Sequence, residues 1–183
     1  DGAYGDKYRM RIGAILETPN FYPYLNAERN LEIIQDIKHS YDDNIHEILE
    51  TVNLSHRLDS KFRAYSLGMK QRLAIAATLI GKPDVVIFDE PTNGLDPEGI
   101  AEVRKILKKV ADSGKTVIMA SHLLDEVEKI CSHVAIIRNG ELLETGLVGS
   151  ILSENITVEV SAADLNRLQT LLSNMAWVRD LKR

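Results

Sequence analysis

The chain has 183 residues, 44% hydrophobic and 27% charged, with a formal net charge of −5. This composition suits one globular domain with a small appendage and argues against a general nucleic-acid binder, which needs clustered lysine and arginine. No apolar run approaches the roughly 20 residues that span a bilayer, and the single cysteine, Cys131, excludes an internal disulfide and favours a reducing compartment.

The first part of the chain predicts a strand followed by helices. Residues 11–17 are expected to form a short strand. Residues 18–20 end this strand, and an aromatic loop follows at 21–25. Asn26 suits an N-cap, and apolar residues recur at helical spacing over 27–39, over 43–52 and from Ser66 to Gly81. The chain begins without Met or any signal-peptide pattern, so we expect the native protein to extend upstream.

The second part predicts alternating strands and helices. The run Val85–Phe88 is continuously apolar, which indicates a strand buried on both faces, and Thr116–Ala120 is expected to be the next buried strand. The remaining expected elements are a helix at 97–111 capped by Asp96, a helix at 123–130 and a strand at 134–137. This order predicts a parallel sheet with helices on its faces.

The end of the chain predicts a hairpin and an appendage. Asn139-Gly140 is a strong two-residue hairpin turn leading into 141–144. Alternation then restarts with an expected strand at 156–160, a helix at 163–172 and a further extended pair at Trp177-Val178. We interpret this pattern as the start of a small β-α-β appendage.

Two acids, Asp89 and Glu90, directly follow the apolar run. In open α/β sheets, ligands bind outside the carboxyl ends of the strands. A hard cation such as Mg²⁺ is held by one or two carboxylates together with phosphates, and a second carboxylate can deprotonate a water. The alternative, that both acids merely end a strand and face solvent, fits the dipeptide alone equally well.

The next predicted strand ends in Ser121-His122. If the two strands are parallel neighbours, His122 lies on the same sheet edge as Glu90, where it can contact a phosphate or a nucleophilic water. The alternative is a histidine at a helix start behind a Ser121 cap, and that alternative would be preferred for His122 taken alone.

A predicted helix begins after Tyr65-Ser66-Leu67-Gly68-Met69. A helix N-terminus offers unpaired N–H groups, Ser66 adds a hydroxyl, and Gly68 permits close approach of a ligand. Ser66 is otherwise an ordinary cap. Asp96 likewise has a cap role, with a role near the acidic pair in addition.

Gly114-Lys115-Thr116 ends like a phosphate-binding loop, but Lys109 stands where that motif needs its first glycine. A helix also precedes a strand there, whereas the motif needs the strand first. We therefore reject this stretch as a phosphate site.

Together these residues resemble the ATP-binding-cassette ATPases, over about 11–149. Asp89 and Glu90 match the family's Walker B aspartate and catalytic glutamate, and His122 looks like its switch histidine. Residues 93–96 resemble its D-loop and 65–69 its signature loop, although the signature reads Tyr-Ser-Leu-Gly-Met. Glu17 stands where the family has its Q-loop glutamine, and we find no Walker A loop.

The resemblance implies an α/β fold: part of a P-loop NTPase (RecA-like) core with a parallel sheet, and an all-helical signature subdomain. The expected division is 1–25 for the part of the core with the Q-loop position, 26–81 for the helical subdomain, 82–149 for the core with Walker B and switch histidine, and 150–183 for the appendage. It also implies ATP and Mg²⁺ as cofactors, with Glu90 and His122 catalytic and Asp89 and Glu17 at the metal. The residues expected to bind nucleotide are Glu17, Ser66, Leu67, Gly68, Met69 and Asp96.

Glu17 with its Thr-Pro-Asn-Phe-Tyr-Pro, and the stretch from Tyr65 to Arg72, are similar to the bacitracin and lantibiotic exporter branch. That similarity implies export of drugs or peptide antibiotics. It also implies a location on the inner face of the plasma membrane, with transmembrane permease subunits and a second nucleotide-binding subunit as partners and no nucleic acid. Without Walker A, we expect these residues alone to be inactive. The alternatives are a soluble cassette ATPase acting on ribosomes or DNA, and a non-catalytic regulatory cassette.

Overall fold

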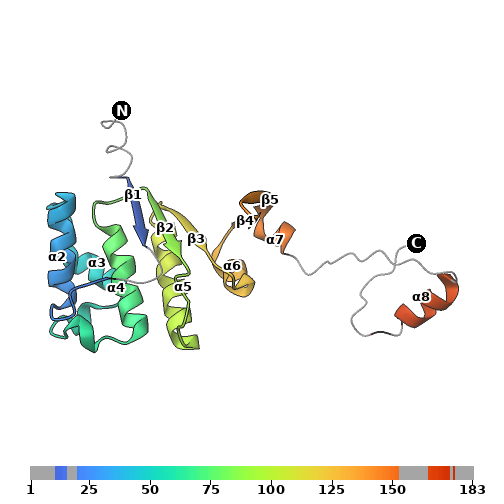
Figure 1. The fold of residues 1–183 in the computed structure, drawn as a ribbon, viewed down its shortest axis with the longest axis horizontal. Helices are drawn as coiled ribbons and strands as arrows, with labels where there is room; N and C mark the ends of the chain where they lie inside the picture. Colours follow the sequence, from blue (N-terminus) through green and yellow to red (C-terminus); the bar gives the residue numbers. More distant parts are fainter. Residues whose placement is uncertain (1–10, 16–19, 153–164, 174, 176–183) are drawn as a thin grey trace.

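The computed structural model describes residues 11–15, 20–152, 165–173 and 175. Along the chain follow one strand, a helical block, two further strands that complete a three-stranded parallel sheet with helices beside it, and a β-hairpin (Figure 1). None of the helices in these ranges is long and apolar enough to cross a membrane. The predicted boundaries between subdomains at 25/26, 81/82 and 149/150 stay predictions.

The helical block contains three α-helices: α2 (Ala27–Lys38), α3 (Ile45–Thr51) and α4 (Leu67–Leu79). Their N-caps use side-chain oxygens as expected, because Asn26 Oδ1 accepts from Arg29 N at 2.9 Å and Ser66 Oγ from Met69 N at 3.2 Å. Helix α3 begins two residues later than Asp43, at the residue after its cap, Asn44.

Asp43 instead ties the helical block to the start of the sheet. Its buried carboxylate accepts a hydrogen bond from Gly81 N, at the end of α4, and Lys38 Nζ donates to Ile80 O at 2.8 Å. Burial lowers the pKa of Lys38. These bonds fix the loop that leads from α4 into the central strand.

The sheet has β2 (Val85–Asp89) at its centre, parallel to β1 (Ile12–Ile15) on one side and to β3 (Thr116–Ala120) on the other. On one face Val86 and Phe88 are fully buried against α4 and α5 (Pro97–Asp112). On that face a Cβ at Gly13 would lie 2.2 Å from Thr78 O, so only glycine lets β1 approach α4 this closely.

The opposite face of the sheet is open in the residues that the structure describes. Ile87 and Ile118, which are neighbours in the register, are 37% and 50% exposed. The prediction that Val85–Phe88 is buried on both faces, with Thr116–Ala120 also buried, is therefore wrong for this structure. The apolar core formed with α4 and α5 includes the side chains of one face only.

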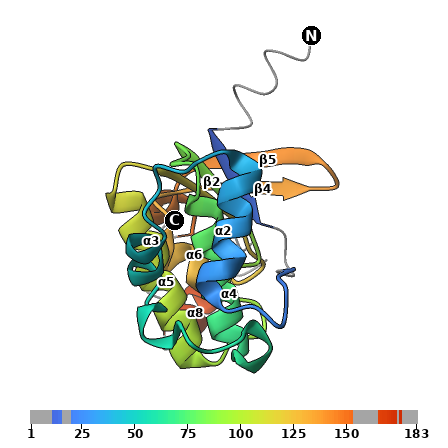
Figure 2. The same cartoon turned by 90° about the vertical axis from the view of Figure 1, so that its left-hand side faces the viewer.

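The predicted hairpin is present, but its first strand does not extend the parallel sheet. Strand β4 (His133–Arg138) pairs antiparallel with β5 (Glu141–Leu147) in a sheet of their own, around Asn139 and Gly140 with φ of 52° and 81°. Strands β1 and β3 lie on the two sides of β2, and β4 pairs with neither of them. Figure 2 shows the hairpin projecting from the body.

Short helices α6 (Leu124–Ile130) and α7 (Val148–Ile151) flank this hairpin. Helix α8 (Leu165–Ser173) confirms the helix expected in the appendage. The strands expected at 156–160 and at Trp177-Val178 lie outside the described residues, as does Glu17.

Candidate functional site

The central strand β2 ends at Asp89, and Glu90 directly after it has an unusual backbone. Its φ of 47° lies in the left-handed region that residues other than glycine rarely adopt. Its N–H donates to Ala120 O at 3.0 Å, at the end of β3. Strained backbone of this kind is concentrated at functional sites, and here it turns Glu90 toward the neighbouring strand end.

Glu90 and His122 are in direct contact. His122 Nδ1 lies 2.8 Å from Glu90 Oε1, and the His122 backbone N–H donates to the same oxygen at 3.1 Å. The structure thus confirms that both residues share one sheet edge. The other carboxylate oxygen, Glu90 Oε2, is buried without a hydrogen-bond partner among the described residues. A carboxylate with one oxygen held and one unpaired can accept a proton from a bound water.

Asp89 lies beside this pair, in register with Ala120. Its side chain is exposed and makes no hydrogen bond or ion pair with the residues that the structure describes. No group of three or more His, Cys, Asp or Glu side chains suited to a metal is found in those residues. A single carboxylate fits Mg²⁺, which takes one or two protein carboxylates and completes its shell with phosphates and water.

A second group of predicted residues lines a crevice of about 390 Å³ between the starts of α4 and α5. Ser66, Gly68 and Asp96 all border it, and Leu67 is 52% exposed beside it. A Cβ at Gly68 would meet only Leu95 Cδ2, at 4.0 Å, so the backbone there is open to a ligand. The N-terminal ends of two helices therefore border the same space, and each contributes the positive end of a helix dipole.

Asp96 and Met69 have structural tasks in this arrangement. Asp96 Oδ1 accepts from Gly99 N at 3.0 Å, which confirms the cap role expected for it. The Met69 side chain packs against the core, and its N–H already donates to Ser66 Oγ. Of the predicted nucleotide-binding residues, Met69 is therefore the least available to a ligand.

The turn from Glu90 to Asp96 connects the Glu90–His122 pair with the crevice at the starts of α4 and α5. Thr92 is buried, Asn93 N donates to Glu90 O at 3.1 Å, and Gly94 has a φ of 71°. A Cβ at Gly94 would lie 3.3 Å from Leu67 Cδ2, so this turn packs directly on the start of α4. Sequence reasoning missed this contact, although Asn93-Gly94 signals a left-handed residue.

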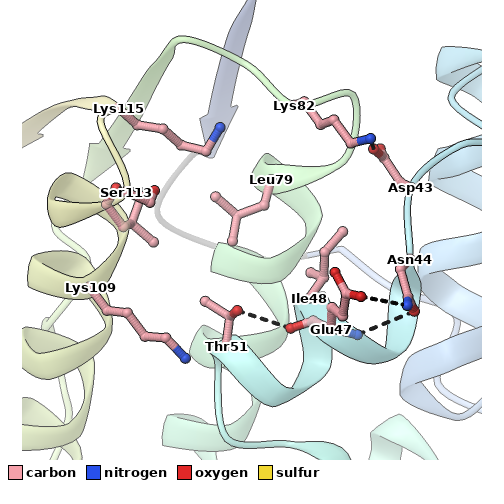
Figure 3. A pocket seen from close by; sticks show the side chains of 11 residues that line it. Asp43, Asn44, Glu47, Ile48, Thr51, Leu79, Lys82, Lys109, Ser113 and Lys115 are labelled. Atoms are coloured by element: carbon pink, nitrogen blue, oxygen red, sulfur yellow. Dashed lines mark hydrogen bonds and ion pairs between the residues drawn. The ribbon is translucent and has the colours of Figure 1, made fainter.

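Other polar features are not suited to the same chemistry. Burial raises the pKa of the Cys131 thiol, which favours its neutral, unreactive form. A hollow of about 230 Å³ between α3 and the ends of α4 and α5 contains three lysines (Figure 3). Two of them are engaged, because Lys82 Nζ lies 3.6 Å from Asp43 and Lys115 Nζ donates to Pro83 O at 2.8 Å.

Comparison with known proteins yields one family. The family described as "ABC transporter" matches residues 4–93. Several curated proteins are similar to this chain. The bacitracin transport ATP-binding protein BcrA of Bacillus licheniformis is 46% identical over 173 residues, which are 93% of this chain and 56% of that protein. The lantibiotic transport ATP-binding protein SrtF of Streptococcus pyogenes is 38% identical over 133 residues, 73% of this chain and 58% of that protein.

Solved structures are similar too. The cbiO1 protein of Clostridium perfringens, described as part of the transporter complex cbiONQ, superposes with a TM-score of 0.71 at 28% identity and covers 81% of this chain and 61% of its own. The expected α/β fold is thereby confirmed. The chain spans about half the length of the curated relatives that it matches.

Proposed function

We propose that the whole protein hydrolyses ATP to drive export of drugs or peptide antibiotics, because this chain carries an ABC transporter domain and fits the ATP-binding subunits of the bacitracin and lantibiotic branch. In this proposal the whole protein works as a pair of nucleotide-binding subunits under transmembrane permease subunits. Its place is the inner face of the plasma membrane.

The observation that carries the proposal is the Glu90–His122 contact at the carboxyl edge of the sheet. Phosphoryl transfer to water depends on positioning and on neutralising charge. Mg²⁺, when bound, would supply part of that neutralisation. Asp89 would hold it, Glu90 would take the proton of the attacking water at Oε2, and His122 would steady the γ-phosphate. The unpaired Oε2 supports the role given to Glu90.

Ser66 and Gly68 would serve a different nucleotide, the one that the partner subunit holds. Their crevice opens between two helix N-termini, and a Cβ built at Gly68 would meet nothing closer than Leu95 Cδ2, at 4.0 Å. Leu67 and Asp96 border the same space. Glu17 is proposed to lie near the metal and to connect this site with the helical block.

The loop at 20–25 is our proposed contact with the permease subunits. Phe21 packs edge-on against Phe62, with ring centroids 5.2 Å apart, so one aromatic of this loop is structural. Tyr22 and Tyr24 are 49% and 60% exposed and lie side by side. Asn30 Oδ1, on α2, accepts a hydrogen bond from Tyr22 N at 2.8 Å, and this bond fixes the loop to the helix.

The export function is tested in a host that is sensitive to bacitracin. We expect the full-length protein, produced with its permease subunits, to raise the minimum inhibitory concentration of bacitracin or of a lantibiotic. The Glu90→Gln variant, made at equal level, should leave the host sensitive. Sensitivity unchanged by the wild-type protein, together with co-sedimentation on ribosomes rather than membranes, would favour the soluble cassette ATPase instead.

We also propose that the 183 residues alone do not bind ATP tightly. No strand followed by G-x-x-x-x-G-K-[ST] occurs among them, so the β- and γ-phosphates have no backbone cradle or lysine from this chain. Isothermal titration with Mg-ATP should give a dissociation constant of roughly 1 mM or weaker. Micromolar affinity for the isolated chain would refute this expectation.

A further inference from the structure

A partly buried ion pair joins α5 to α6. Arg104 Nη2 donates to Glu126 Oε1 at 2.9 Å and to Oε2 at 3.0 Å, and Arg104 Nε donates to Oε2 at 3.2 Å. The Glu126 side chain is 9% exposed and that of Arg104 27%. A two-pronged contact of this kind fixes both the distance and the orientation of its partners.

Besides this ion pair, α6 is anchored by the buried Val127 and by Ile130, which packs against the core. The helix is seven residues long, and only Glu126 and Val127 among its residues are buried. No side chain caps its start at Leu123. A helix this short is not stable alone and keeps its place through its contacts. The ion pair is therefore a principal determinant of where α6 lies.

The position of α6 in turn sets the position of His122. Glu126 N and Val127 N both donate to Leu123 O, at 3.0 and 3.2 Å, so one turn of backbone separates Glu126 from the residue that follows His122. His122 itself is held to Glu90 by its N–H and its ring. Its own side chain is 65% exposed.

Arg104 lies on a rigid support. Its neighbours Val103 and Leu107 are fully buried in the core, and α5 begins at Pro97, directly after its cap Asp96 at the end of the turn that leaves Glu90. The ion pair thus links the helix that follows Glu90 to the helix that follows His122.

We infer that Arg104 and Glu126 are positioning residues, whose contact holds His122 against Glu90. This inference rests on the proposed function for its activity readout, but its structural readout does not need that function. Lys129 offers a matched control, because its Nζ lies 3.7 Å from the same carboxylate on the same helix and its side chain is 50% exposed.

The test compares Arg104→Met with Lys129→Met in the full-length protein. For Arg104→Met we expect kcat for ATP to fall on the order of tenfold or more with KM nearly unchanged, since misplacing a reacting group impairs chemistry rather than binding. Hydrogen exchange at the His122 amide should become faster by a similar factor. Lys129→Met should match the wild type in both measurements.

A double variant separates positioning from loss of fold. Replacing both members of a buried ion pair by apolar residues is often neutral or stabilising. Replacing only one member leaves the other charge buried without a partner, which is strongly destabilising. Arg104→Met with Glu126→Met should therefore recover the melting temperature, whereas exchange at the His122 amide should stay fast and kcat low, because the apolar pair lacks the two-pronged contact.

Two results would overturn the inference. One is wild-type exchange at the His122 amide in Arg104→Met. The other is a double variant that regains slow exchange at His122 and wild-type kcat together with its melting temperature, because the ion pair would then not be needed for positioning. A wild-type protein that hydrolyses no ATP would contradict the proposed function instead, and the exchange measurement would still decide on the positioning role.

Discussion

Glu90→Gln is expected to abolish ATP turnover in the full-length protein while leaving nucleotide binding close to the wild-type level. The amide keeps the size of the carboxylate and one oxygen to accept from the His122 N–H, so the contact at 3.1 Å can persist. It cannot take a proton from water. General-base catalysis is worth roughly a hundredfold to ten-thousandfold in rate, and we expect a loss in that range.

Phosphate release and equilibrium binding of Mg-ATP, measured on the same preparation, check this expectation. Glu128→Gln is a matched control, because Glu128 is an exposed glutamate on α6, outside the proposed site. Normal turnover by Glu90→Gln would show that another group accepts the proton. A loss of binding together with turnover would show that Glu90 acts mainly on the nucleotide's charge or on the fold.

Local patterns in the sequence predicted the starts of the helices well. Asn26, Ser66 and Asp96 each cap a helix through a side-chain oxygen, because capping depends only on residues within one turn. The error at α3 was small: the apolar spacing over 43–52 did not determine the first residue of the helix, which begins at Ile45 after its cap Asn44. Asp43 is used for a longer-range bond to Gly81.

Predictions that needed knowledge of neighbouring elements were less successful. A continuous apolar run does not reveal which face of a strand is covered, and Ile87 proved to be 37% exposed. The alternation of strands and helices suggested that β4 would extend the parallel sheet, but the Asn139-Gly140 turn gave it an antiparallel partner. Tertiary context decided both outcomes.

The candidate site followed from one topological rule. Parallel neighbouring strands end at the same edge, so Glu90 and His122 were expected to meet, and they do at 2.8 Å. The left-handed backbone of Glu90 and the packing of Gly94 on Leu67 were not predictable from residue types. The Arg104–Glu126 pair was also missed, since its members are 22 positions apart on two separate helices.

The second large effect is expected for Gly68→Asp, which should leave the fold intact and impair ATP turnover. A Cβ at this position meets nothing closer than 4.0 Å, and Gly68 is not among the positive-φ glycines. An acidic residue in the first turn of α4 also favours the helix by about 0.3–1 kcal/mol. The melting temperature should therefore equal or slightly exceed that of the wild type.

The same carboxylate would face the phosphates of the partner's nucleotide. Two like charges about 4 Å apart repel by about 4 kcal/mol near a protein surface, so we expect turnover to fall by at least roughly a hundredfold. Gly68→Asn, equal in size but neutral, is the control and should retain much more activity than Gly68→Asp. If both variants hydrolyse ATP at the wild-type rate while remaining folded, the start of α4 is not near a phosphate, and Ser66 caps its helix and does nothing more.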